Sequence, residues 1–293
     1  MVSLTKRIPI HVWGGLGSQL FAVALSLDLK ERFPSRHLLL KLHTSGVTSR
    51  TSEIDLIFPD LEKLQIMDFS AESKKSAEPN RGFRITKPLI LKIFALVANG
   101  LGLINRCNTD KEFEKLKPWI LTIRGHYAYR SISSSTLLIL WDRLTSLATP
   151  GLDSKESEDS LAIHYRLGDL LTLADKDPID VKRIGLEIQR LVEAHNPSRI
   201  LCFSDSPQVA TKLLQSFTLG RPLESKDLPA LSVIREACKS KLFIGSNSKI
   251  SFWIVCLRLF RLPTFQNSLP KGSKINWIHC SDRELQYASV VEF

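Results

Sequence analysis

The pattern of apolar and polar positions opens with a strand, a glycine turn, a helix and a second strand. Residues Ile8–Trp13 alternate and favour a strand, and Gly14–Gly17 predict a turn. Residues Ser18–Phe33 carry an almost wholly apolar face, which predicts a helix ended by Pro34, and His37–Leu42 follow as a second strand. This order of elements is the repeating unit of a parallel sheet.

The middle of the chain gives weaker signals. We expect two helices near Ser52–Phe58 and over Pro88–Leu103, a strand over Trp119–Arg124 and a helix over Ser135–Leu147. The segment Ala148–Ser160 combines a proline and a glycine with a run of polar and charged residues, which is typical of a linker. The sequence therefore predicts two domains, residues 1–152 and 153–293.

The second half alternates clearly between short strands and helices. The predicted strands are Leu161–Tyr165, Ile200–Phe203, Leu242–Gly245 and Leu262–Gln266, and the predicted helices are Val181–Ala194, Gln208–Phe217, Leu228–Ser240 and Ile250–Phe260. Each step switches the apolar period from two residues to about 3.6. We predict an α/β protein with two Rossmann-like domains that face each other across a cleft.

Charged and flexible residues follow directly on the strand that ends at Tyr165. His164 and Arg166 lie at this strand end, and a glycine and Asp169 come next. Open α/β sheets bind ligands at the carboxyl edge of their strands, and a guanidinium can bind two phosphate oxygens at once. The alternative is an ordinary strand exit in which Arg166 pairs with Asp169.

Two more strand ends in the second half carry small polar residues. Asp205 lies between two serines after one strand, and Ser246, Asn247 and Ser248 follow another. Strand ends of a parallel sheet meet at one edge, so these residues and His164 together favour a nucleotide diphosphate site. The alternative is that the serines only cap the helices that follow.

The first glycine turn is a candidate anion site, because it exposes backbone N–H groups before a helix. Its candidate residues are Gly14, Gly15, Gly17 and Gln19. Leu20 stands where a dinucleotide fingerprint has its third glycine, and the second strand ends without an acidic residue, which argues against NAD. A tight turn that lets helix and strand pack closely explains the glycines equally well.

Composition adds the expected sign of the partners. Lys and Arg outnumber Asp and Glu by 40 to 30, a net charge of +10, which favours anionic partners. No nucleic-acid-binding motif accompanies this charge, so we expect no nucleic acid partner. The cysteines are scattered without metal-ligand spacing and predict free thiols: Cys107, Cys202, Cys238, Cys256 and Cys280.

The N-terminus shows no secretory signal pattern, and the longest apolar run, Ile93–Ile104, is too short to span a bilayer. We expect a cytoplasmic protein. The basic segment Lys74–Arg130, with the amphipathic stretch Leu89–Leu103, has two interpretations. It is either a solvated basic face or a peripheral contact with anionic lipid on the inner face of the cytoplasmic membrane.

Four motifs in order carry a family resemblance. They are Gly-Gly-Leu-Gly-Ser-Gln-Leu-Phe, His-Tyr-Arg-Leu-Gly-Asp, Phe-Ser-Asp and Ser-Asn-Ser-x-x-Ser-Phe-Trp. With them, the chain resembles the bacterial α-1,2-fucosyltransferases of glycosyltransferase family 11 over about residues 8–280. The resemblance implies a GT-B-like fold with an N-terminal acceptor-side domain and a C-terminal domain that binds the GDP-sugar. It further implies GDP-L-fucose as donor, a galactoside-type glycan as acceptor, lipid-linked or free, and no metal or other cofactor.

By this resemblance, Arg166 stabilises the leaving diphosphate, and Asp169 orients Arg166 or acts as the base. The implied donor-binding residues are His164, Arg166, Asp205, Ser246, Asn247 and Ser248, and the loop Gly14–Gln19 faces the cleft. Asp28 and Glu53 are weaker candidates for the base.

The chain departs from the family motifs most clearly at Leu167, where the family has a second Arg. Further departures are Ser18, Leu170, Ser206 and Phe252. They leave open a related GDP-deoxysugar, another nucleotide sugar, or a nucleotide-sugar-binding protein without catalysis.

Overall fold

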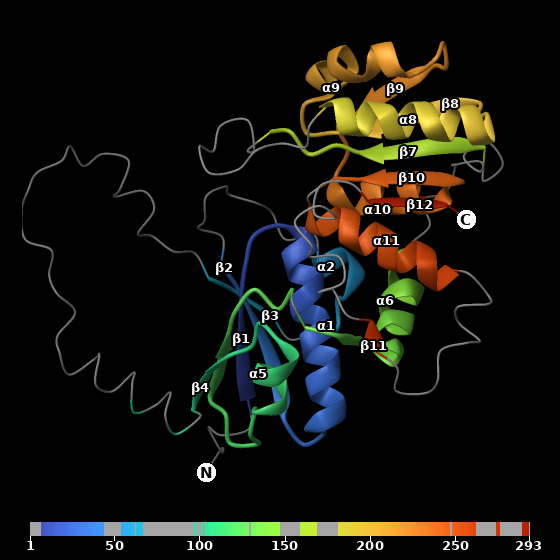
Figure 1. The fold of residues 1–293 in the computed structure, drawn as a ribbon. Coiled ribbons are helices and arrows are strands. Elements are labelled where there is room, and N and C mark those ends of the chain that lie inside the picture. Colours follow the sequence, from blue (N-terminus) through green and yellow to red (C-terminus); the bar gives the residue numbers. More distant parts are fainter. Residues whose placement is uncertain are drawn as a thin grey trace, which may run out of the picture. The chain divides into compact units, whose positions relative to one another are not determined.

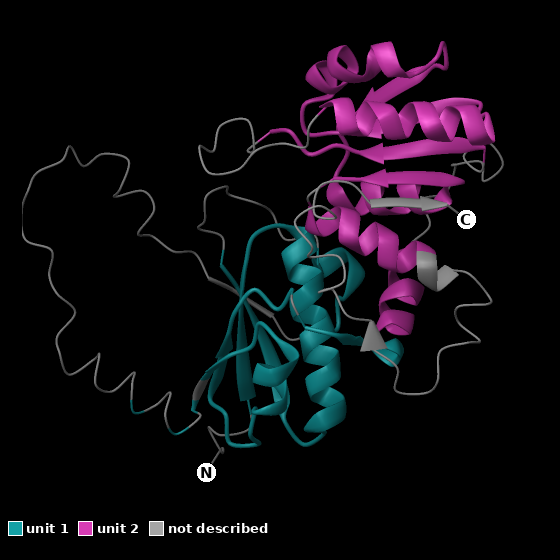
Figure 2. Cartoon of the chain, viewed as in Figure 1, with its two compact units in different colours: residues 1–136, 272–277 teal, residues 137–271, 278–293 magenta. Residues whose placement is uncertain are grey.

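Two α/β units make up the chain in this computed structural model (Figure 2). The first comprises residues 1–136 and 272–277, and the second comprises residues 137–271 and 278–293. The structure describes residues 7–43, 54–61, 63–66, 97, 101, 103–128, 130–146, 159–168, 181–246, 248–261, 274–275 and 289–292. The predicted domain boundary at residues 152 and 153 lies outside the described residues.

The first unit is built on a five-stranded sheet in the order β3-β2-β1-β5-β4, in which every pair is parallel (Figure 1). The strands are β1 (Arg7–Trp13), β2 (His37–His43), β3 (Lys63–Ile66), β4 (Ile104–Arg106) and β5 (Thr122–Arg124). β1 and β2 pair in register from Arg7 and His37 to Trp13 and His43. Both strands therefore end at the same edge of the sheet.

Helix α1 (Leu16–Arg32) covers one face of this sheet (Figure 1). Alternate side chains of β1 are buried at Ile8, Ile10 and Val12, which places them on a single face. Nearly all residues of α1 between 16 and 29 are buried, and most of them are apolar, as expected for a helix that is covered on most sides. The described part of the unit also contains the short helices α2 (Ile54–Ile57) and α5 (Asp110–Glu114).

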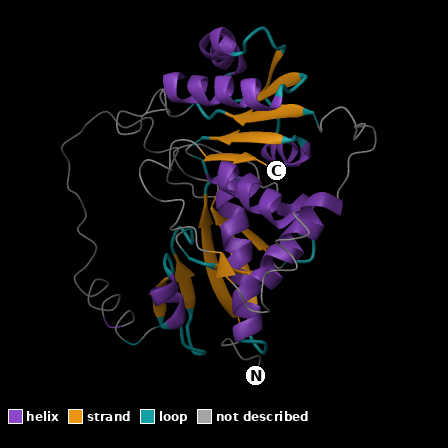
Figure 3. Cartoon of the chain, turned by 45° about the vertical axis from the view of Figure 1, so that its right-hand side comes forward, coloured by secondary structure: helices purple, strands orange, loops and turns teal. Residues whose placement is uncertain are grey.

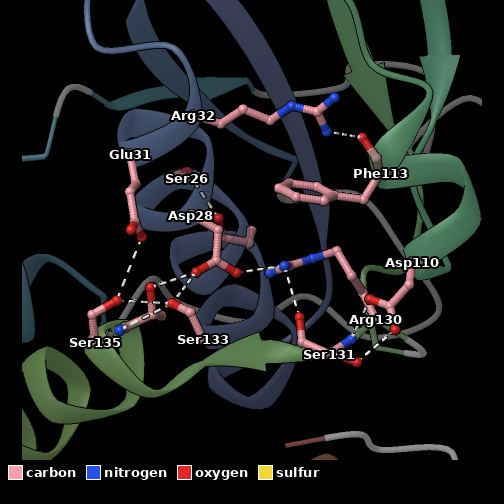
Figure 4. Close-up of polar contacts among 12 residues, drawn as sticks. Ser26, Asp28, Glu31, Arg32, Asp110, Phe113, Arg130, Ser131, Ser133 and Ser135 are labelled. Atoms are coloured by element: carbon pink, nitrogen blue, oxygen red, sulfur yellow. Dashed lines mark hydrogen bonds and ion pairs between the residues drawn. The ribbon is translucent and has the colours of Figure 1, made fainter. Parts of the chain in front are cut away.

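A buried polar network fixes α1 to the segment before α6 (Ser134–Ser146) (Figure 4). The carboxylate of Asp28, 7% exposed, pairs with the guanidinium of Arg130, which is 2% exposed. It also accepts hydrogen bonds from the hydroxyls of Ser133 and Thr136, each at 2.6 Å. The guanidinium carbon of Arg130 lies 4.8 Å from the centre of the Phe113 ring. Both charges are thus neutralised inside the unit.

The second unit contains a sheet in the order β12-β10-β7-β8-β9, in which only the β10–β12 pair is antiparallel. Its strands are β7 (Ser160–His164), β8 (Arg199–Phe203), β9 (Leu223–Lys226), β10 (Leu242–Gly245) and β12 (Ser289–Glu292).

The first unit also contains a separate two-stranded sheet, which joins β6 (Ile132–Ser133) to β11 (Lys274–Ile275).

Helices pack on both faces of the second sheet, as parallel sheets require (Figure 3). On one face, Ile163 and Tyr165 join a core with residues of α8 (Val181–His195) and α9 (Pro207–Leu214). A 3₁₀ turn, Gln215–Phe217, continues α9. The helices α10 (Ala230–Lys239) and α11 (Lys249–Arg261) contact the other residues of β7 and β10. Because successive strand residues alternate, His164 lies on the opposite face from Ile163.

The predicted α/β class with two units is confirmed, as are the strands and helices of the described second half. The sequence did not predict β9, whose Leu-Glu-Ser-Lys lacks an apolar pattern. Nearly all of the helix expected over Pro88–Leu103, and the strand expected over Leu262–Gln266, lie outside the described residues. Among the described helices, none has the length and apolar character needed to cross a membrane.

The buried ion pair leads to a stability prediction. We expect Asp28→Asn to lower the free energy of unfolding by about 3–5 kcal/mol, because it leaves the Arg130 guanidinium buried without its counter-charge. Urea denaturation followed by circular dichroism measures this change. The control is Glu31→Gln on an exposed position of the same helix, for which we expect at most about 0.5 kcal/mol. Equal effects of the two substitutions would contradict the assignment.

Candidate functional site

Three strand ends meet at one edge of the second sheet. β7 lies between β10 and β8, and its last residue His164 is in register with Gly245 on one side and Phe203 on the other. The residues that follow these strands therefore emerge side by side at the carboxyl edge. The structure thus brings together the described members of the three polar segments that the sequence singled out.

A chain of hydrogen bonds through Ser251 links His164 to the end of β10. The Nδ1 atom of His164 lies 2.7 Å from the Oγ atom of Ser251, on α11. The same Oγ accepts a bond of 3.0 Å from the backbone N–H of Ser246. The Oγ atom of Ser246 in turn accepts a bond of 3.1 Å from the backbone N–H of Arg166. Two strand ends and one helix are thus tied together around His164.

Burial lowers the pKa of His164 to about 4, and the positive charge of Arg166 adds to this effect. The carboxylate of Asp205 acts in the opposite direction but does not cancel it. His164 is therefore neutral at neutral pH. A neutral imidazole has one nitrogen that donates and one that accepts, so it suits a hydroxyl or a phosphate oxygen as a hydrogen-bonding partner rather than as an ion pair.

Asp205 binds the turn that carries Arg166. Its Oδ1 atom accepts hydrogen bonds from the backbone N–H groups of Leu167, at 2.9 Å, and Gly168, at 2.8 Å. A Cβ atom on residue 168 would lie 2.5 Å from Oδ2 of Asp205, so only glycine fits here without displacing the carboxylate. Asp205 thus acts on this turn directly. Its predicted contact with a donor sugar nucleotide stays a prediction.

The side chain of Leu167 is fully buried, which gives a physical reason for the missing second Arg. It belongs to the core on the α8 face, together with Tyr165 and Ile184. A guanidinium at this position would be desolvated in an apolar core, or the turn would have to be rebuilt. The half-buried Arg166 is the basic residue that the described part of this turn presents.

The polar residues before the helices have partly structural roles. Ser248 Oγ accepts a bond of 3.2 Å from the backbone N–H of Ile250, which caps the start of α11. Ser206 occupies the N-cap position of α9 but makes no capping bond through its side chain. Phe252 and Trp253 are core residues. Asp169 and Asn247 lie outside the described residues.

The glycine turn of the first unit lies between β1 and α1. Gly14 has φ 95°, a left-handed conformation that favours glycine, and Gly15 is the N-cap of α1 without a side-chain capping bond. Gly17 is buried in the first turn of the helix. The side chain of Gln19, 4% exposed, donates from Nε2 to the carbonyl oxygen of Gly14 at 3.2 Å. No residue in the first turn of α1 is acidic, so this part of the helix supplies no carboxylate to the backbone N–H groups at its start.

A stack of three aromatic rings, which we did not predict from the sequence, lies at the carboxyl edge of the first unit's sheet. Trp13 and His43 are opposite each other at the ends of β1 and β2, and their ring centres lie 4.3 Å apart with an angle of 11°. The His11 ring lies 5.0 Å from that of His43, and its Nδ1 atom is 2.8 Å from His43 Nε2. The signal was available in the alternation of β1, which puts His11 and Trp13 on one face.

Asp28 is unsuitable as a base. Its carboxylate is buried and accepts bonds from three side chains, as described above, so it does not reach a ligand. Glu53, the other weak candidate, lies outside the described residues. Within the described part of the chain, no three His, Cys, Asp or Glu side chains are grouped as metal ligands would be.

No protein-family model matches the chain, and no curated protein sequence does. The chain is similar to the solved structure of a glycosyl transferase of family 9 from Veillonella parvula, with 9% identity and a TM-score of 0.43 over 85% of this chain and 79% of that one. It is also similar to E. coli heptosyltransferase WaaC with ADP, at 12% identity and TM-score 0.42, over 86% and 84% of the two chains. A third similar structure is POFUT1 in complex with GDP-fucose, at 11% identity and TM-score 0.44, over 88% and 96%. These similarities assign no residue role, donor or acceptor to this chain.

The lowered pKa of His164 predicts a pH dependence of stability. Because the unfolded chain binds a proton near pH 6.5 and the folded chain only near pH 4, His164 destabilises the fold increasingly as the pH falls through this range. Between pH 7 and pH 5 the free energy of unfolding of the parent chain should decrease. In His164→Gln, we expect this decrease to be smaller by about 1–2 kcal/mol. Urea titrations at both pH values measure it. The same loss in both proteins would show that His164 titrates normally in the fold.

Proposed function

We propose that this chain is an inverting glycosyltransferase with a GT-B arrangement. It moves L-fucose or a related 6-deoxysugar from a GDP-sugar to a galactoside-type hydroxyl of a surface glycan. The single observation that carries the proposal is the convergence of His164, Arg166 and Asp205 at the carboxyl edge of β10, β7 and β8. The family resemblance of the four motifs supplies the donor, the acceptor class and the linkage.

Transfer with inversion develops positive charge on the sugar ring and negative charge on the departing GDP. Arg166 is the group that we assign to the diphosphate, because a guanidinium binds two of its oxygens in one plane. A fixed cation in a site of this kind is worth about 10²–10³ in rate. The Asp205 bonds hold the turn that follows Arg166 before any ligand arrives, so this charge needs little reorganisation.

His164 would bind the donor as a neutral hydrogen-bonding group. Its pKa near 4 makes proton abstraction at neutral pH weak, which argues for a binding role over a role as the base. Ser251 fixes the orientation of its ring. Asp169 remains our proposal for the residue that orients Arg166 or takes the acceptor proton. Asn247 and Ser248 remain proposed donor-binding residues.

The burial of Leu167 favours one alternative, a nucleotide-sugar-binding protein without transferase activity. A single Arg at this turn gives less stabilisation of the leaving group than the pair found in the family motif. Activity of the parent chain separates the two functions. A cytoplasmic location, a peripheral membrane contact through Lys74–Arg130 and independence from metal ions remain parts of the proposal.

The direct test is GDP release from GDP-L-fucose with galactoside acceptors in the presence of EDTA. We expect release by the parent chain, and a decrease in kcat of at least about tenfold for Arg166→Ala, because the diphosphate loses its fixed cation. The matched control is Arg190→Ala, an exposed arginine of α8 paired with Glu187, which should keep the parent rate. GDP binding without release would support the non-catalytic alternative, and retention of nucleic acid with no GDP binding would overturn both.

The close approach of Gly168 to Asp205 gives a second prediction. We expect Gly168→Ala to weaken GDP binding by about tenfold, or about 1.4 kcal/mol, because the new Cβ displaces the carboxylate that holds the turn. Isothermal titration calorimetry with GDP measures the loss.

The matched substitution for the same turn is Asp205→Asn, which retains an acceptor oxygen for the two backbone N–H groups. It should bind GDP more tightly than Gly168→Ala. Parent-like affinity in Gly168→Ala would mean that the turn does not position Arg166.

A further inference from the structure

The aromatic stack of the first unit lies at the carboxyl edge of its sheet, where parallel sheets bind their ligands. Trp13 ends β1 and His43 ends β2, both at the carboxyl edge. Although its ring stacks on His43, Trp13 remains 40% exposed. A large aromatic ring that is held on one side and accessible to solvent is suited to stacking against a ligand with a flat apolar face.

Two hydrogen bonds hold the residues of the stack in place. The hydroxyl of Tyr127, itself buried, donates to the carbonyl oxygen of His11 at 2.5 Å. The two imidazoles bond to each other at 2.8 Å, so one ring donates an N–H to the other. The position of the Trp13 ring is therefore set by β1 and by His43 before a ligand binds, which lowers the entropy cost of binding.

The polar groups around the stack suit hydroxyls. Burial lowers the pKa of His11 to about 4, and the nearby charges of Arg124 and Lys41 add to this effect. His11 is thus neutral at neutral pH, and because its Nδ1 is bonded to His43, its Nε2 is the nitrogen left for a ligand. The alcohol groups of a sugar both donate and accept hydrogen bonds, so they can bond to a neutral imidazole.

A buried acceptor without a partner lies at the adjoining turn. Among the described residues, no donor reaches the Oε1 atom of Gln19, while its Nε2 is bonded to the carbonyl of Gly14, next to Trp13. An unsatisfied buried amide oxygen costs about 1–3 kcal/mol. The turn next to Trp13 therefore carries an unsatisfied polar atom that is closed to solvent, and a ligand reaches it only if the side chain of Gln19 moves.

We propose that Trp13, His43 and His11 form a subsite for the acceptor sugar, with a pyranose ring stacked on Trp13 and its hydroxyls bonded to the imidazole pair. The proposal rests on the proposed function, because it takes the sugar to be the acceptor of the transfer. Galactose-type rings have one face of axial and equatorial C–H groups that fits an aromatic ring, while their hydroxyls need partners that donate and accept.

The test uses methyl β-D-galactopyranoside and lactose as probes. Saturation-transfer NMR detects their binding without any reaction, and the GDP-release assay gives the KM for lactose. We expect Trp13→Ala to raise the KM for lactose by at least about tenfold and to abolish the saturation-transfer signal, with the KM for GDP-L-fucose unchanged. Trp13→Phe, which keeps a ring, should show a smaller increase. The matched control is Trp119→Ala, an exposed tryptophan of the same unit away from the stack, which should keep the parent values.

The outcomes separate the subsite from the proposed function. A sugar signal that depends on Trp13 in a chain that releases no GDP keeps the subsite and removes the transfer. GDP release with a lactose KM that Trp13→Ala leaves unchanged removes the subsite and keeps the transfer. Absence of a signal with both probes in the parent chain overturns the subsite, and so does a loss of GDP binding in Trp13→Ala, which would indicate a nucleobase on the ring. If the circular dichroism spectrum of Trp13→Ala shows that this variant does not fold, the same measurements are made on Trp13→Phe and His43→Gln.

Discussion

Parallel pairing in register is the constraint on which the candidate site depends. Gly245, His164 and Phe203 end three neighbouring strands at one level, so the residues after them emerge within hydrogen-bonding reach. The bonds from the turn of Arg166 to Asp205 and Ser246 exist because of that alignment. A shift of β7 by one residue would also turn His164 into the α8 core and Ile163 out of it.

The alternation of side chains in β7 continues past the end of the strand, and it explains why position 167 carries no second Arg. Tyr165 and Leu167 are buried on the α8 face, while His164 lies on the face of α11. Position 167 therefore belongs to the core, while the half-buried Arg166 lies at the carboxyl edge of the sheet. Packing of the second unit and the chemistry of its site are coupled through a few consecutive residues, so a change at Leu167 would affect both.

Periodicity predicted much of this arrangement, because apolar spacing shows which residues form strands and where the strands end. It therefore located His164, Arg166 and Asp205 at one edge. It could not show Ser251 as the partner of His164, because that bond joins residues 87 positions apart and depends on how α11 packs. For the same reason Asp28 looked available as a base: its partner Arg130 is 102 positions away. The alternation of β1 shows that His11 and Trp13 share a face, but the stack of Trp13 on His43 also requires the register of β1 and β2, which periodicity does not give.

Amide chemical shifts on titration with GDP test most directly whether the nucleotide binds at the carboxyl edge of the second sheet. We expect the largest shifts in the described chain on residues 164–168, 203–206 and 245–246. Shifts confined to the first unit, or none at millimolar GDP, would contradict it.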